Sequence, residues 1–150
     1  MRSTSAFTLM EVMITVIMIG VIATLSLPRL TGLLEKARAE KATNNLKSIH
    51  AAEKRFKLDD PLGEYFPKSC NNAAADTLQE INAGLGLSTR DSGFTYRIKA
   101  TGLCSGSPAS RRSLNYTITA ERTAEGPCAG KVITMTEEGG EPSSDDCSIW

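Results

Sequence analysis

The sequence predicts an α+β fold in which one long N-terminal helix packs against an antiparallel β-sheet. Three observations predict it. Residues 7–27 form a nearly uncharged apolar run, residues 28–58 continue it with apolar positions at helical spacing, and three later runs alternate apolar and polar residues. A helical segment followed by a series of strands is typical of α+β domains. We therefore expect a long helix over residues 7–58 and an α+β head over residues 59–150.

The apolar run, FTLMEVMITVIMIGVIATLSL, contains a single charged residue, Glu11, and no Lys or Arg. As a helix it would be roughly 30 Å long, which is the thickness of a bilayer core. A carboxylate inside such a segment costs at least about 2.5 kcal/mol, so it requires a partner and usually marks function. The segment offers no partner except the new amine that a cut before Phe7 would create. We expect residues 7–27 to cross a membrane.

The first six residues, MRSTSA, predict a leader peptide that is removed. They carry Arg2 and end in the small residue Ala6. A secretory signal peptide is cut after its apolar core, whereas here the small residue precedes the core. The apolar segment should therefore remain in the mature protein. Arg2 predicts that the N-terminus stays in the cytoplasm and that the rest of the chain lies outside it.

The stem that follows, residues 28–58, has apolar residues spaced mostly by three to five, as in a helix with one buried stripe. They are Leu30, Leu33, Leu34, Ala37, Ala42, Leu46, Ile49, Ala52 and Phe56. Pro28 removes a hydrogen bond to the carbonyl of Thr24, and Gly20 lowers helix propensity further. Two interpretations stay open: a Gly and a Pro that a membrane helix tolerates, or a weak point at which the helix can melt.

The head is expected to contain one short helix and three strands. Turn residues at 59–63 end the stem, and residues 73–84, AAADTLQEINAG, predict the short helix. The strands are predicted at 94–100, 114–120 and 131–136, with Gly, Ser and Pro clusters between them. We expect these strands to form an antiparallel sheet that packs on the stem.

All four cysteines, Cys70, Cys104, Cys128 and Cys147, lie after the stem. An even number confined to the part outside the cytoplasm predicts two disulfides in an oxidising compartment. We favour Cys70–Cys104 with Cys128–Cys147, because each pair encloses a contiguous segment and the two do not cross. Four cysteines allow three connectivities, and the other two stay open.

Composition argues against several functions. Lys plus Arg and Asp plus Glu each total 17, so a general nucleic-acid binder is not indicated. No C-x-x-C pair is present and His50 is the only histidine, so we expect no metal site and no cofactor. A membrane-anchored enzyme is the least favoured alternative. Its acid–base pair would have to be Asp59 with Asp60, or Glu137 with Glu138, and adjacent acids in turns are usually solvated.

The N-terminal residues resemble the class III signal peptides of type IV pilins and their pseudopilin relatives. The matching features are Ala6, Phe7, Thr8, Leu9, Met10, Glu11, the apolar run, Gly20 and Pro28. The resemblance implies that a prepilin peptidase cuts between Ala6 and Phe7 and methylates the new amine of Phe7. It also implies that Glu11 pairs with the Phe7 amine of a neighbouring subunit. Ala6 is a departure, because most members have Gly there.

The resemblance further implies a pilin fold and a structural subunit of the major-pilin type. Such a subunit polymerises with itself through its N-terminal helix into a type IV pilus-like surface filament. The implied partners are the prepilin peptidase, the inner-membrane pilus assembly machinery, and the membrane before assembly. The implied location is the inner membrane, with the head outside the cytoplasm, and afterwards an extracellular pilus.

The alternative within this family is a pseudopilin of a type II secretion system. The tail, EEGGEPSSDDCSIW, resembles the calcium-binding end of the major pseudopilins, although an acidic solvated tail is the simpler interpretation. Those pseudopilins usually lack a disulfide framework, whereas a C-terminal loop closed by Cys128 and Cys147 is similar to pilin heads. The sequence therefore favours the pilin and leaves the pseudopilin open.

Overall fold

A computed structural model describes residues 7–68, 74–90, 93–103, 112–126, 128–145 and 147. Within these ranges the side chains of residues 25–29, 103, 112 and 113 also lie outside the description. The chain divides into two compact units, Met1–Glu35 and Lys36–Trp150, and each is described by itself.

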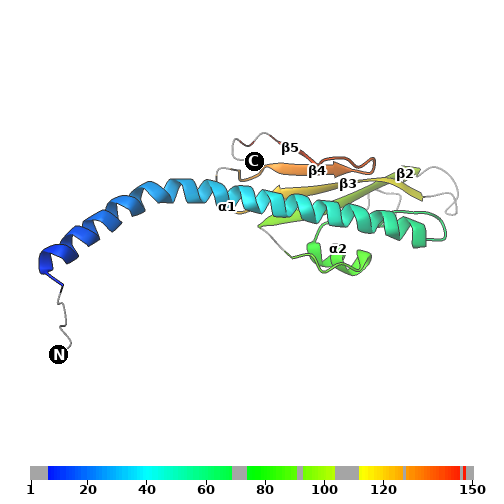
Figure 1. Cartoon of the computed structure of the whole chain (residues 1–150). Helices are drawn as coiled ribbons and strands as arrows, with labels where there is room; N and C mark the ends of the chain where they lie inside the picture. Colours follow the sequence, from blue (N-terminus) through cyan, green and yellow to red (C-terminus); the bar gives the residue numbers. More distant parts are fainter. Residues whose placement is uncertain are drawn as a thin grey trace, which may run out of the picture. The chain divides into compact units, whose positions relative to one another are not determined.

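Helix α1 spans Leu9–Asp59, close to the expected range of 7–58 (Figure 1). It begins after Thr8, whose hydroxyl accepts the backbone N–H of Glu11 at 3.3 Å, so Thr8 caps the first turn. It ends at a turn in which the carboxylate of Asp60 accepts the N–H groups of Leu62 and Glu64. Among the residues that the structure describes, we find no helix that is long and apolar enough to span a membrane. The expected membrane segment, 7–27, includes residues 25–27, whose side chains are outside the description.

The second unit contains a five-stranded antiparallel sheet with the strand order β1-β2-β3-β4-β5. The three predicted strands are all present, as β2 (Phe94–Leu103), β3 (Arg112–Arg122) and β4 (Val132–Thr136). The two edge strands, β1 (Ala74–Ala75) and β5 (Ser143–Ser144), were not predicted. Two residues are too few to show the alternation by which a strand is identified.

The core of the second unit lies between the sheet and the C-terminal half of α1. Ile98 pairs with Ile118 across β2 and β3, and both side chains are fully buried. Leu46 and Ile49 of α1 are fully buried in the same cluster. Figure 1 shows this part of α1 lying across the sheet. The predicted α+β architecture, with the stem packed on an antiparallel sheet, is confirmed.

Helix α2 spans Leu78–Leu85, so the prediction of a helix over 73–84 began too early. Thr77 is the N-cap, and Thr77 and Glu80 exchange the two hydrogen bonds of a capping box. The preceding alanines pair with β2 instead, with Ala74 opposite Lys99. The helix ends at Gly86, whose φ of 64° is a left-handed conformation that favours glycine.

The buried stripe of the stem also begins later than predicted. Leu30, Leu33 and Leu34 are exposed, and they lie in the first unit. In the second unit Ala37 is exposed and Ala39 is buried in its place. The spacing of apolar residues could not show which of these positions are buried and which are exposed. The reason is that the size of the sheet determines how much of the helix it covers.

Candidate functional site

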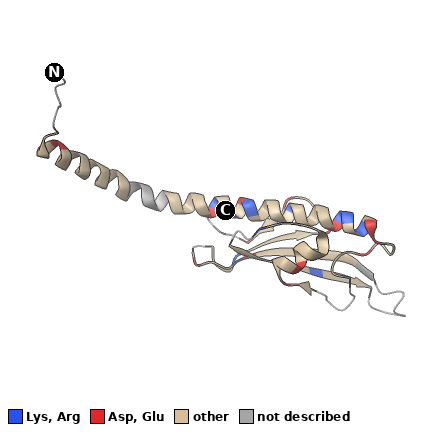
Figure 2. Cartoon of the chain, turned by 90° about the horizontal axis from the view of Figure 1, so that it is seen from below, with Lys and Arg blue, Asp and Glu red and all other residues tan. Residues whose placement is uncertain are grey.

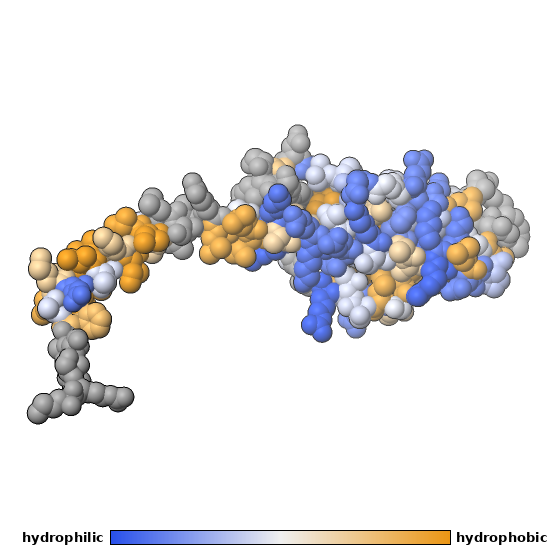
Figure 3. All heavy atoms as spheres, viewed as in Figure 1, coloured by the Kyte–Doolittle hydropathy of each residue, from blue (hydrophilic) through white to orange (hydrophobic). Residues whose placement is uncertain are grey.

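The N-terminal part of α1 exposes apolar side chains on all sides. We call residues 7–24 the apolar arm; Figure 3 shows it as a largely hydrophobic surface. Its large apolar side chains are each about half exposed or more, from 48% at Ile14 to 81% at Phe7. A helix that is apolar all round is normally buried, either in a protein core or in a membrane. The arm therefore requires cover that its own unit does not supply among the described residues.

Glu11 is the only charged residue of the apolar arm. Figure 2 shows the arm almost without charged residues, with red only close to its N-terminal end. Its carboxylate accepts the hydroxyl of Thr8 at 3.4 Å, a weak contact that the sequence analysis did not foresee. It also lies in the first helical turn, where the helix dipole favours a negative charge. Both groups are exposed, so the carboxylate is accessible to a positive group from another chain.

The other predicted residues of this region fall at the following places. Phe7 is exposed and directly precedes the cap residue Thr8, whereas Ala6 lies outside the described residues. Gly20 lies within α1, and a Cβ built on it would meet no atom within 4 Å. Pro28 lies within α1 by its backbone, and its side chain is outside the description. Melting of the helix between Gly20 and Pro28 stays a prediction.

The cysteines are described only in part. Cys128 and Cys147 form a disulfide with a Cα–Cα distance of 5.8 Å, and it closes the C-terminal segment that contains β4 and β5. Cys70 and Cys104, the other predicted pair, lie outside the described residues.

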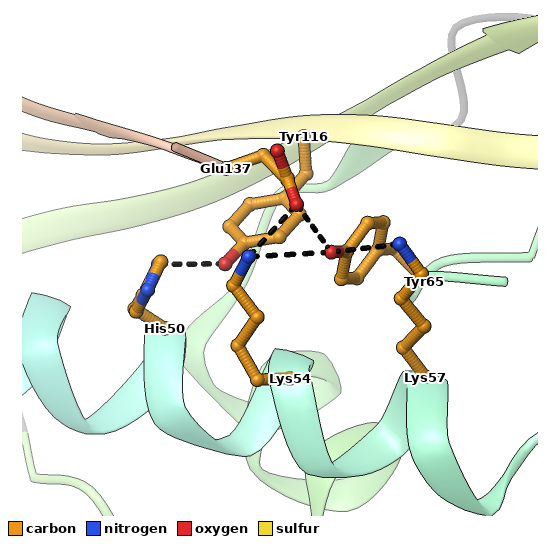
Figure 4. A network of polar contacts seen from close by, with 6 residues as sticks. All are labelled: His50, Lys54, Lys57, Tyr65, Tyr116 and Glu137. Carbon is orange, nitrogen blue, oxygen red and sulfur yellow. Dashed lines mark hydrogen bonds and ion pairs between the residues drawn. The ribbon is translucent and has the colours of Figure 1, made fainter. Parts of the chain in front are cut away.

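A polar network that is not predictable from the sequence joins α1 to the head (Figure 4). The Nζ atom of Lys54 lies 2.8 Å from Oε1 of Glu137, which also accepts the hydroxyl of Tyr65 at 2.6 Å. Lys57 donates to the same Tyr65 hydroxyl at 3.1 Å. The helical spacing of the two lysines was visible in the sequence. Their partners come from distant segments that only the fold brings together.

A second contact of this network joins His50 of α1 to Tyr116 of β3, with 2.7 Å between Nδ1 and the hydroxyl. Burial raises the pKa of Tyr116 above its ordinary value, so the phenol stays protonated and donates. Burial lowers the pKa of His50, and the charge of Lys54 lowers it further, so the imidazole is held neutral and accepts. This contact fixes the helix on the sheet.

The charges of the network stabilise one another. The hydrogen bond from Lys54 lowers the pKa of the Glu137 carboxyl, and that from Tyr65 lowers it further. The hydrogen bond to Glu137 raises the pKa of the Lys54 ammonium in turn. Both groups are therefore charged at neutral pH. Their arrangement is that of a structural ion pair and not that of an acid and a base about to exchange a proton.

The acid pairs considered for a membrane-anchored enzyme do not form acid–base sites. Asp59 is exposed, while Asp60 holds the turn after α1 and pairs with Lys68. Glu137 belongs to the network above, whereas Glu138 is exposed. Neither arrangement joins a nucleophile to a base.

Carboxylates of the acidic tail, which are the candidate calcium ligands, have separate partners within the chain. Glu141 pairs with Lys47 at 2.8 Å, and Glu137 pairs with Lys54. Asp145 accepts the backbone N–H of Val132 at 3.2 Å. These carboxylates face separate partners, and the described part of the chain contains no cluster of three His, Cys, Asp or Glu residues that could hold a metal ion. Asp146 lies outside the described residues.

No family model matches this chain, and no solved structure matches it. The chain is similar to type II secretion system core protein G of Aeromonas hydrophila, with 32% identity over 97 residues that cover 65% of this chain and 66% of that protein. The corresponding protein of Vibrio cholerae is 38% identical over 62 residues, which cover 41% of this chain and 42% of the relative. That of Escherichia coli K12 is 40% identical over 63 residues, which cover 40% and 43%. The chain thus spans just under two thirds of the first of these relatives and about two fifths of the other two.

Proposed function

Because this chain belongs to the family of type IV pilins and type II secretion pseudopilins, we propose that it is a pseudopilin, a structural subunit that polymerises with itself through α1 into a secretion-system filament. The observation that carries the proposal is the apolar arm, which is exposed all round and has one carboxylate near its N-terminal end. Complete burial of a large apolar side chain contributes about 1.5–3 kcal/mol. The arm is therefore stable only in lipid or packed against other arms.

The relatives change the preference between the two members of the family. The sequence alone favours a type IV pilus subunit over a secretion pseudopilin. The relatives carry the name of a secretion-system core protein, and this supports the pseudopilin. The same name supports a structural role over a membrane-anchored enzyme. The disulfide Cys128–Cys147 is the one feature that favours a pilus subunit.

The position of Glu11 suggests how the filament is aligned. Its carboxylate would meet the Phe7 amine of a neighbouring subunit within a core of apolar arms. A charge buried there without a partner would cost about 3–5 kcal/mol. Subunits would therefore pack in the one register that brings the two charges together.

The amine of Phe7 exists only after the leader is removed. We expect a prepilin peptidase to cut between Ala6 and Phe7 and to methylate the new N-terminus, while the arm anchors the subunit in the inner membrane. Mass spectrometry of the mature chain tests this step. A chain that still begins at Met1, or one cut after Ala23, would contradict it.

Assembly should also loosen α1 between Gly20 and Pro28. Pro28 lacks the donor for one backbone hydrogen bond, and Gly20 lowers the helix propensity of this stretch. A subunit that leaves the bilayer can then change the length and direction of its arm. A filament reconstruction with an unbroken helix through residues 20–28 would argue against this step.

Deletion of the gene tests the proposed function directly. A pseudopilin deletion should stop the export of type II secretion substrates and leave surface pili intact. Export should return with the wild-type gene, and it should not return with a Glu11→Ala gene. Loss of pili with normal export would support the pilus subunit instead, and no effect on either would contradict both.

A further inference from the structure

Glu53 is an acidic residue in the core of the second unit. It lies on α1 and its exposed fraction is 0%. One carboxyl oxygen, Oε2, accepts the backbone N–H of Phe66 at 3.0 Å. The other, Oε1, is buried and has no hydrogen-bond partner among the residues that the structure describes. This side chain therefore connects α1 to the segment that follows it, and it does so with half of its hydrogen-bonding capacity unused.

The surroundings of Glu53 offer it no compensating charge. Among the described residues it makes no ion pair. Among the described residues, the titratable groups on or against this part of α1 include His50, Lys54 and Lys57 of α1, Tyr65 after it, Tyr116 of β3, and Glu137 after β4. The ammonium of Lys68 also lies over the ring of Phe56, and it pairs with Asp60. The ammonium groups of Lys54 and Lys57 bind Glu137 and the hydroxyl of Tyr65. A charged Glu53 would raise the pKa of Tyr116.

A buried carboxylate without an ionic partner is unfavourable, so the neutral acid is preferred. Burial raises the pKa of Glu53 to about 8, and the hydrogen bond from Phe66 lowers it only in part. The folded head therefore holds a proton on Glu53 at neutral pH. An unfolded or opened chain, in which the carboxyl reaches water, would release that proton.

We propose that Glu53 is a proton-binding site that couples the docking of residues 60–67 on α1 to pH. While this segment is docked, Glu53 is neutral and buried. When the segment opens, the carboxyl becomes hydrated and releases its proton to water. Raising the pH therefore favours the opened state, and lowering it tightens the head. This coupling is a property of the head alone and does not depend on the proposed filament function.

The segment that Glu53 holds is tied to the core at neighbouring positions. Tyr65 is 1% exposed, and its ring packs edge-on against Tyr116 with 4.7 Å between centroids. The ring of Phe66 packs edge-on against Phe56, and it lies so close to Gly84 of α2 that a Cβ there would be 2.3 Å from it. Opening of the segment would release contacts to α1, α2 and β3 together. A single titrating group at this junction thus affects the packing of three elements.

The decisive variant is Glu53→Gln, which keeps the size of the side chain and a carbonyl that can accept from Phe66 but cannot titrate. Amide hydrogen exchange of Phe66 should be measured in the full-length chain in detergent, as protection factors between pH 5 and 9. In the wild type the protection factor should fall as the pH rises from 4.5, the ordinary pKa of a glutamate, to about 8. The fall should be up to about tenfold per pH unit, and the protection factor should level off above about pH 8. In Glu53→Gln this fall of the protection factor with rising pH should be absent. Equal pH dependence in both proteins would overturn the proposal.

Two further measurements guard against a variant that fails to fold. Infrared spectroscopy of the wild type should show a protonated carboxylic acid at pH 6.5 that disappears above about pH 8. If all carboxyl groups titrate in their ordinary acidic range, the proposal is wrong. Glu138→Gln is the matched control, because Glu138 is exposed. This variant should keep the infrared band of the protonated acid, and the protection factor of the Phe66 amide should depend on pH as in the wild type.

Discussion

The Nζ atom of Lys54 lies 2.8 Å from Oε1 of Glu137, and the hydroxyl of Tyr65 donates to that same oxygen at 2.6 Å. Lys54 belongs to α1, Tyr65 to the segment after it, and Glu137 to the segment after β4. One carboxylate oxygen therefore joins three parts of the chain (Figure 4). The ion pair is partly exposed, with 42% of the lysine and 26% of the glutamate side chain accessible, so water weakens its charge interaction.

The first prediction concerns the strength of this ion pair. A double-mutant cycle with Lys54→Met and Glu137→Gln should give a coupling free energy of up to about 1 kcal/mol in urea unfolding. The Lys47–Glu141 pair is the matched control, because 84% of the Glu141 side chain is exposed. Its coupling should be close to zero. Equal coupling free energies in both pairs would show that the shared Tyr65 hydroxyl does not strengthen the Lys54–Glu137 ion pair.

This coupling should also depend on pH in a defined direction. The pKa of Glu137 is lowered in the folded protein, first by the hydrogen bond from Lys54. Its contribution is therefore fully present above the unfolded value of 4.5 and is lost as the pH falls through the folded value. Stability of the wild type should fall below about pH 4.5 more steeply than that of Glu137→Gln.

The second prediction concerns His50, the only histidine of the chain. Its pKa is lowered by burial and by Lys54, so the folded state resists protonation. The stabilising effect is present above the unfolded value of 6.5 and declines as the pH falls below it. His50→Asn keeps an acceptor for Tyr116 without this titration, so its stability should depend less on pH between 5 and 7. A single imidazole signal in the proton NMR spectrum allows a direct titration. A midpoint above 6.5 would contradict the prediction.

Glu53 and His50 should oppose each other in such experiments. Protonation of His50 destabilises the folded state as the pH falls, whereas protonation of Glu53 stabilises it. The two slopes overlap just below the unfolded histidine value of 6.5 and partly cancel in the wild type. The effect of His50 should therefore be measured in the Glu53→Gln background, where it should appear larger.

The third prediction concerns the disulfide between Cys128 and Cys147, whose ends are 19 residues apart in sequence. Replacement of both by serine should reduce the free energy of unfolding by about 3 kcal/mol, because the unfolded chain gains freedom. Urea unfolding of the double variant under oxidising conditions measures this. The single variants serve as controls for a free thiol. An unchanged midpoint in the double variant would mean that native-state strain cancels the gain.

Much of the fold could be predicted from sequence because the local patterns were long. The run from Phe94 to Ala100 alternates strictly, and its apolar side chains are those that the structure buries. The capping box at Thr77 was also present in the sequence, but the adjacent alanines concealed the start of α2. The two-residue strands were too short to show any period.

The polar interior of the head could not be predicted for a different reason. Glu53 directly precedes Lys54 and Arg55 in the sequence of the stem, yet it is buried, because the segment carrying Phe66 folds back over it. The sequence places Glu137 beside Glu138 at the start of an acidic tail, and only the fold brings it to Lys54. Helical spacing determines the direction in which a side chain points around the helix axis. It contains no information about which distant segment covers that direction.

The last prediction concerns Glu11 and uses Thr8 to separate two roles. If the carboxylate serves assembly, Glu11→Ala should leave the subunit folded, cut and inserted, since loss of the charge makes insertion easier by about 2.5–3.5 kcal/mol. Filament yield should fall instead, because the Phe7 amine of a neighbour would be buried unpaired at about 3–5 kcal/mol. Glu11→Gln should fail nearly as badly, since it keeps the size but not the charge.

Thr8→Val is the matched control, because Thr8 supplies the only hydrogen bond to the Glu11 side chain among the described residues. It should weaken the first turn of α1 by about 1 kcal/mol and leave assembly nearly normal. The measurement is the yield of sheared filaments relative to membrane-bound subunit. If Thr8→Val were as defective as Glu11→Ala, the role of Glu11 would be to cap its own helix. If both Glu11 variants assembled normally, this carboxylate would not be an assembly contact, and the register of the filament would have to come from the apolar side chains alone.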